Sequence, residues 1–152
     1  MTFQPQANQK IQIGDTVFRL AEHPAAPGMP YGQEGRQATV YQLVAPSPVA
    51  TGQGLGPVLS VPKDGGTRAL KVFKPRFRVP ALVASSERLA AFANLPGLQV
   101  CQRTVLTPQR QGTLLREYPY LTYAVLMSWI EGPTWWLMMI EKRALVDRKS
   151  VV

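Results

Sequence analysis

The chain has 152 residues, of which 45% are hydrophobic, and carries a net charge of +8. This composition excludes a disordered chain, and the length suits one ordinary domain. The longest apolar run, Trp135 to Ile140, is far shorter than the roughly 20 residues of a membrane span. Residues 1–10 lack the apolar core of a signal peptide, and one cysteine, Cys101, leaves no internal disulfide. We therefore expect a cytoplasmic protein without a membrane partner.

Strand patterns alternate with loops in the first half of the chain. Residues 1–12 are polar and rich in glutamine, which predicts a flexible N-terminal tail. Period-two alternation and β-branched residues then predict three strands, at residues 16–21, 38–44 and 67–73. Proline and glycine predict two connections, a loop at 23–32 and a long loop or insertion at 45–66.

The pattern changes to a helical period at residues 80–95, where Pro80 suits the first turn. The expected apolar face of this helix consists of Leu82, Leu89, Phe92 and Ala93. We expect this face to pack on the sheet.

Two more strands are predicted near 99–107 and 121–130, joined by a polar hairpin loop at 108–117. Thr134 can cap a short last helix within 133–152. The order of elements predicts an α+β fold: a five-stranded antiparallel sheet with one packed helix, followed by a short C-terminal helix.

Lys71 is the most informative residue, because it interrupts an apolar strand. Burying an ammonium group is costly unless an anion or water accompanies it. Glu87, on the predicted helix, is the best placed carboxylate, so we expect the two to pair or to lie on facing elements. The alternative is an edge strand from which Lys71 reaches solvent.

Five residues in chain order extend this pattern: Gly35, Val40, Ala69, Lys71 and Glu87. The set resembles the N-terminal lobe of the eukaryotic-type Ser/Thr protein kinases, in a bacterial homologue. That family carries a Gly-rich hairpin ending in valine, a V-A-I-K strand and a helix glutamate. The resemblance implies that Val40 and Ala69 cover the adenine of ATP, that Lys71 contacts the α- and β-phosphates, and that Glu87 holds Lys71. A long Lys71–Glu87 distance would mark an inactive state.

The segment from Leu126 to Gly132 resembles the kinase strand and hinge that hold adenine. Met127 falls at the back of the pocket, and the backbone of Ser128 and Ile130 would hydrogen-bond the adenine edge. The resemblance assigns 13–132 to the lobe and 133–152 to the helix after the hinge.

The glycine loop departs from the family pattern. Its three glycine positions fall on Gln33, Gly35 and Ala38, so only the middle one is glycine. The catalytic H-R-D and the magnesium-binding D-F-G are absent from this sequence. The resemblance therefore implies a chain truncated before the catalytic loop, which binds ATP weakly, does not transfer phosphate, and uses Mg only in a complete kinase.

Two classes of function remain open. The first is this kinase-like ATP-binding lobe, whose partner is either the missing C-terminal lobe or a second copy, held through Trp135, Trp136, Met138 and Met139. The second is a non-catalytic binding module: a pseudokinase scaffold, or a basic β-domain that binds nucleic acid or protein. Nucleic acid is not the favoured ligand, because the basic residues are spread along the chain without a long run.

Overall fold

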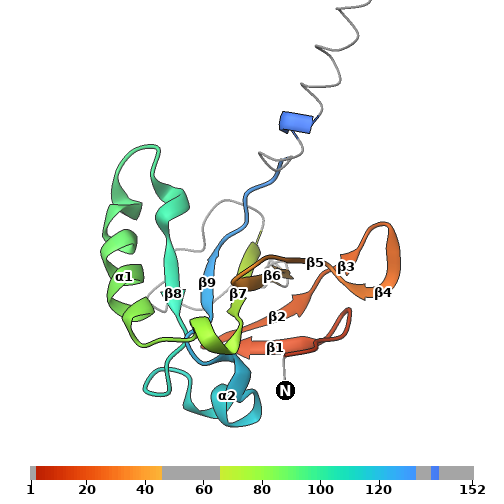
Figure 1. Ribbon diagram of the computed structural model, residues 1–152, viewed down its shortest axis with the longest axis horizontal. Helices are drawn as coiled ribbons and strands as arrows, with labels where there is room; N and C mark the ends of the chain where they lie inside the picture. The colour runs from red at the N-terminus through yellow and green to blue at the C-terminus, as the bar shows by residue number, and fades with distance from the viewer. Residues whose placement is uncertain (1–2, 46–65, 133–137, 141–152) are drawn as a thin grey trace, which may run out of the picture.

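The computed structural model describes residues 3–45, 66–132 and 138–140. The chain forms an α+β fold with a curled antiparallel sheet, as expected (Figure 1). The strands are β1 (Lys10–Ile13), β2 (Thr16–Leu20), β3 (Glu22–His23), β4 (Ala26–Pro30), β5 (Gly32–Glu34), β6 (Ala38–Val44), β7 (Thr67–Phe73), β8 (Arg103–Val105) and β9 (Val125–Ser128). The α-helices are α1 (Ala81–Ala90) and α2 (Gly112–Glu117), and four 3-10 turns are η1 (Pro75–Phe77), η2 (Ala91–Asn94), η3 (Gln99–Cys101) and η4 (Pro119–Leu121).

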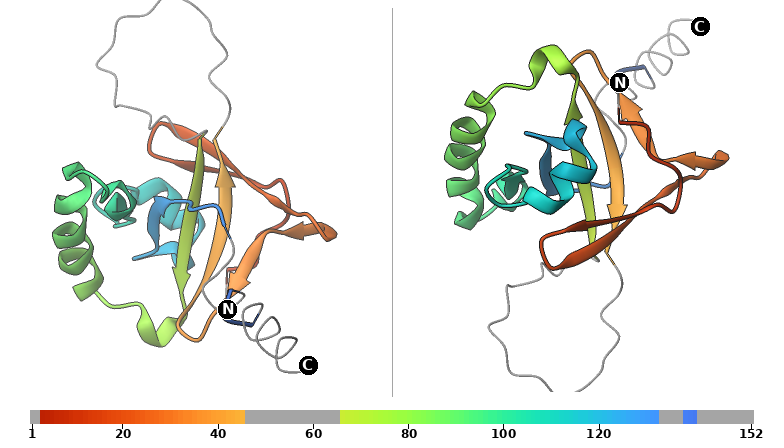
Figure 2. Two further views of the ribbon diagram at one scale, coloured as in Figure 1. Left: turned by 90° about the horizontal axis from the view of Figure 1, so that it is seen from above. Right: turned by 90° about the horizontal axis from the view of Figure 1, so that it is seen from below.

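The main sheet has the order β1-β2-β6-β7-β9-β8, with β5 also paired to β6, whereas β3 and β4 form a separate hairpin. The described part thus has seven strands in one sheet, not the expected five. The two extra strands, β1 and β5, are too short to give a clear alternating pattern. Figure 2 shows α1 on one side of the sheet and the β3–β4 hairpin projecting on the other.

The N-terminal segment corrects the expected tail over 1–12. Ile11 and Ile13 of β1 are buried. Phe3 is also buried, and its ring packs edge-on against Tyr41 and Tyr118, with centroid distances of 5.7 and 6.1 Å. The polar composition of this segment predicted a tail because composition averages over the segment. It does not show that the few apolar residues, Phe3, Ile11 and Ile13, are spaced so that they reach the core.

One edge of β6 is shared by two strands. β2 pairs with the end of β6 and β5 with its beginning. Gln42 links them: the Ala21 N–H donates to its carbonyl, and its own N–H donates to the Tyr31 carbonyl, both at 2.9 Å. The expected loop at 23–32 is therefore mostly the β3–β4 hairpin, inserted into an otherwise continuous edge.

Two clusters of apolar side chains lie on opposite faces of β7, because neighbouring residues of a strand point to opposite faces. Leu70 and Val72 belong to the larger cluster, together with β1, β2 and the buried Leu114 and Leu115 of α2. Phe73 belongs to the smaller cluster, together with Ala38, Val105 and Val125. Leu82 and Val83 of α1 pack against this cluster. The loop expected at 108–117 thus contains α2, whose six residues are too few for a clear helical period.

The C-terminal half differs from prediction mainly at element ends. The helix expected at 80–95 is α-helical only over α1 and continues as η2. The strands expected at 99–107 and 121–130 shorten to β8 and β9. η3 occupies the first residues of the former range, and the end of η4 and a turn at 122–123 occupy those of the latter. Most of the 45–66 connection and of the 133–152 segment lies outside the described residues, although 138–140 are helical.

No helix in the described ranges combines the length and the hydropathy needed to cross a bilayer.

Candidate functional site

The site residues expected on β6, β7 and β9 share one face of the sheet. Val40 lies opposite Lys71, and Ala69 lies opposite Met127. Cross-strand partners in an antiparallel sheet point to the same face, as do residues two apart along one strand. This is the face that α1 covers, because Phe73, two residues after Lys71, packs with α1 side chains.

A hollow of 380 Å³ opens beside this face, at the tip of the β5–β6 hairpin. Its walls consist of Gln33, Glu34, Gly35, Arg36, Gln37, Ala38, Val40 and Lys71. Lys71 and Arg36 bring two cations to it, and Glu34 is the only acidic residue in its lining. Larger hollows lie elsewhere, one of them of 520 Å³ between β1 and α2.

The hairpin tip uses Gly35 as a turn residue. The Gly35 N–H donates to the Ala38 carbonyl at 2.8 Å, so this amide is not directed at the hollow. The amides of Arg36 and Gln37 make no hydrogen bond to any described residue. The geometry therefore leaves the amides of Arg36 and Gln37, and not that of Gly35, open to a ligand.

The expected ion pair between Lys71 and Glu87 is not formed in the described structure. The Lys71 Nζ lies over the Phe73 ring, 5.1 Å from its centroid. The Glu87 carboxylate accepts a hydrogen bond from the Arg110 guanidinium at 3.3 Å, and both side chains are more than half exposed. The two residues are nevertheless on the same side of the sheet, since Lys71 points to the face that α1 covers. Arg110, which sequence reasoning did not select, is the partner that takes up Glu87.

A second ion pair borders the hollow. Lys74 Nζ lies 2.7 Å from Glu34 Oε1. The hydrogen bond from Lys74, and then its positive charge, lower the pKa of Glu34 below its usual value. Because Lys74 neutralises this carboxylate, the uncompensated charge around the hollow is positive.

The expected hinge residues lie at the end of β9 and directly after it. Ala69 is buried and Met127 is half-buried on the Lys71 face. Ser128 ends β9 opposite Arg68, whereas Ile130 lies beyond the strand and is 66% exposed. Between them Trp129 packs on Tyr31, with ring centroids 5.6 Å apart, so an aromatic contact anchors the chain directly after the strand.

Of the four residues expected to mediate self-association, the structure describes only Met138 and Met139. Trp135 and Trp136 lie outside the described residues. Met138 and Met139 are exposed, at 39% and 43%.

Among the described residues no group of three or more His, Cys, Asp or Glu side chains is close enough to hold a metal ion. Comparisons of the chain with protein-family models, with curated proteins and with solved structures found no match. Its function is therefore inferred from its own residues and their geometry.

Proposed function

We propose that the Lys71 face of the sheet binds ATP, as the nucleotide-binding lobe of a cytoplasmic kinase-like transferase, and that this chain alone does not transfer phosphate. The supporting observation is the register of β6, β7 and β9. It brings Val40, Ala69, Lys71 and Met127 to one face beside a hollow rimmed by cations.

Adenine binding needs a flat apolar surface with backbone groups at its edge. Val40 and Ala69 carry short apolar side chains, and Met127 lies on the same face. The backbone of Ser128 and Ile130, at and beyond the end of β9, would supply the edge hydrogen bonds. This part of the proposal rests on the resemblance together with the shared face.

Phosphate binding would fall on the hairpin tip. The ammonium of Lys71 and the guanidinium of Arg36 line the hollow, and both charge types bind phosphate oxygens. The open amides of Arg36 and Gln37 add donors at a turn, where successive N–H groups favour anions.

The described residues do not fit magnesium. Hard cations prefer several oxygen ligands, and the only carboxylate of the hollow, Glu34, is already paired with Lys74. ATP should accordingly bind weakly, with a dissociation constant of about 0.1 mM or more, equivalent to about −5.5 kcal/mol or less favourable.

Titration of ATP, followed by amide NMR shifts, tests the proposal. We expect Lys71→Ala to weaken binding about tenfold, because a charge-assisted contact is worth roughly 1.5–3 kcal/mol. Lys10→Ala removes a strand lysine distant from the hollow and should change affinity by less than about twofold. Shifts should appear at Val40, Ala69 and Met127. Equal affinity of wild type and Lys71→Ala would refute the phosphate contact, and shifts confined to other faces would refute the site.

A binding module without nucleotide chemistry is the second candidate. It is favoured by the pairing of Glu87 with Arg110, which leaves Lys71 without a carboxylate partner in the described structure. A basic domain of this kind predicts oligonucleotide binding that falls steeply with salt and depends on many Lys and Arg residues. Oligonucleotide affinity insensitive to Lys71→Ala, together with no ATP-induced shifts, would favour this candidate.

A further inference from the structure

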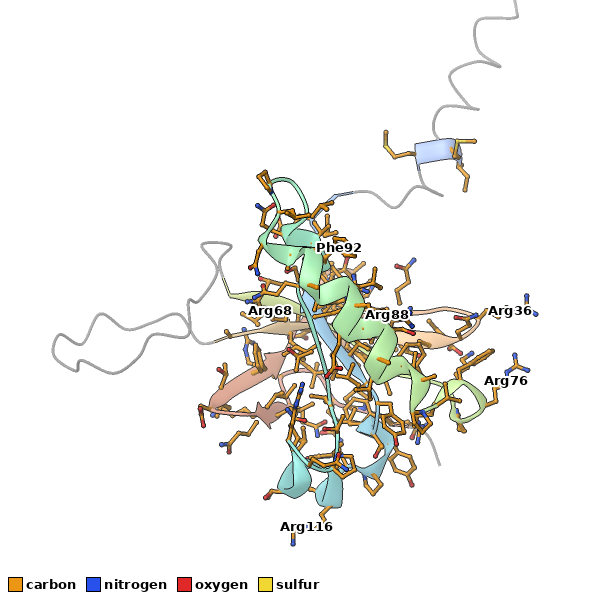
Figure 3. All side chains as sticks on the ribbon, turned by 90° about the vertical axis from the view of Figure 1, so that its left-hand side faces the viewer. Arg36, Arg68, Arg76, Arg88, Phe92 and Arg116 are labelled. Carbon is orange, nitrogen blue, oxygen red and sulfur yellow. The ribbon has the colours of Figure 1, made fainter. Side chains whose placement is uncertain are left out.

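The helix face that the sequence assigns to the core is only partly covered: Leu82 packs on the smaller cluster, but the large residues that follow it on this face are turned outward. Leu89 and Phe92 are 43% and 49% exposed. Ser86 is the one buried side chain of α1. Figure 3, which views the molecule from the side of α1, labels Arg88 on α1 and Phe92 on η2. Leu89 at the end of α1 and Phe92 in η2 therefore lack a covering element within the described structure.

The exposed face continues past the helix. We define the α1–η3 surface by its large, exposed apolar side chains: Leu89, Phe92, Leu95, Leu98 and Val100. Consecutive tight turns hold these residues together: the N–H of Leu95 donates to the Phe92 carbonyl, and that of Leu98 to the Leu95 carbonyl, both at 3.0 Å. A contiguous exposed apolar patch of this kind is typical of a protein interface.

The charge around the α1–η3 surface is mainly positive, and Glu87, which borders it on α1, is paired with Arg110. From residue 88 to residue 116 the chain contains four arginines and no aspartate or glutamate. Arg110 is occupied by Glu87. Arg88 neighbours Leu89, and Arg103, whose Nε donates to the Cys101 carbonyl at 3.0 Å, lies beside η3. Arg103 also shares a hollow of 120 Å³ with Arg68.

These three arginines form no salt bridge with any described residue, whereas Lys74 and Arg110 do. The α1–η3 surface is thus apolar in its middle, with Arg88 on its helix side and Arg103 and Arg68 on its η3 side. A ligand that matches it must present large apolar side chains flanked by negative charge.

We propose that the α1–η3 surface docks an acidic amphipathic segment of a partner protein. A second copy of this chain matches the surface less well, because the copy carries the same arginines and a net charge of +8. Peptide helices commonly bind through an apolar face seated on a hydrophobic surface, and complementary charge selects among such peptides. The proposal does not depend on nucleotide binding.

Two synthetic peptides of about 18 residues provide the probe. Both have leucine and phenylalanine on one helical face, and the other face is glutamate in one and lysine in the other. Amide NMR of the full chain should show saturable shifts at Arg88, Leu89, Phe92 and Val100 with the glutamate peptide. The lysine peptide should bind about tenfold more weakly or not at all. Equal binding of both peptides, or shifts outside this surface, would overturn the proposal.

Three variants locate the contact. Phe92→Asp should weaken the glutamate peptide about tenfold or more, and Arg88→Glu should weaken it while improving the lysine peptide. Met29→Asp changes another exposed apolar residue, on β4, and should leave affinity within about twofold. All three positions are exposed, so an unchanged amide spectrum elsewhere will verify the fold. Affinity unchanged by Phe92→Asp would refute the proposal, as would a dimer of the wild-type chain that Phe92→Asp dissolves, since a second copy would then be the occupant.

Discussion

Replacing Phe3 with alanine tests whether the first residues belong to the folded core. The Phe3 ring is 9% exposed and meets two tyrosine rings edge-on. Truncation of a buried phenylalanine costs about 3–5 kcal/mol, and each edge-to-face pair accounts for about 0.5–1.5 kcal/mol beyond area burial. Because Phe3 is near the chain end, the neighbouring residues can partly close the space it leaves. We therefore expect the free energy of unfolding to fall by about 3 kcal/mol.

Equilibrium urea unfolding, followed by tryptophan fluorescence, measures this loss. Phe92→Ala is the matched control: it removes the same atoms from a side chain that is 49% exposed. We expect the control to cost less than about 1 kcal/mol, as is usual for surface substitutions. Equal losses for the two variants, or no loss for Phe3→Ala, would show that residues 3–9 do not contribute to the core and that a flexible tail describes them better.

Three further predictions concern the Lys74–Glu34 ion pair, Gly32 and the self-association of the chain. Lys74→Met should raise the pKa of Glu34 toward its usual value, as measured by carbon NMR of the carboxyl group. Because the folded-state pKa of Glu34 is lowered, the ion pair stabilises the fold at pH values above the unfolded-state pKa. That stabilisation is lost as the pH falls through the folded-state pKa. Gly32→Ala should cost about 1–3 kcal/mol in urea unfolding, because a Cβ there would lie 2.8 Å from the Tyr41 ring; an unchanged midpoint would mean that the ring moves freely. Sedimentation at micromolar concentration should show self-association that Met139→Glu weakens, and a monomeric wild type would contradict it.

The strands around the candidate site could be predicted because their signal is local. Residues 38–44 and 67–73 are rich in apolar residues and bounded by turn signals, and β6 and β7 span these same residues. The strand geometry also determines that Lys71 shares a face with Ala69 and Phe73 and lies opposite Leu70 and Val72. A side chain's face within one strand depends only on its immediate neighbours.

The partners of these residues could not be predicted, because they come from distant segments. The helical period predicted one core-facing group of Leu82, Leu89 and Phe92, and the structure separates them. The tertiary structure covers Leu82 with the small cluster and leaves Leu89 and Phe92 in solvent. Likewise, the sequence identified Glu87 as a helix carboxylate, and only the fold brings Arg110 to it.

The sequence by itself thus determined the period of each long element, and with it the side chains that share a face. Only the tertiary structure decided what covers each face, because coverage depends on where distant chain segments come to lie, from 23 residues away for Glu87 and Arg110 to 115 for Phe3 and Tyr118. The entropic cost of closing such loops grows slowly with separation. The contact between Phe3 and Tyr118 is the clearest case, because no local sequence pattern predicts it. It forms because the segment before β1 and the end of α2 meet over the same apolar cluster.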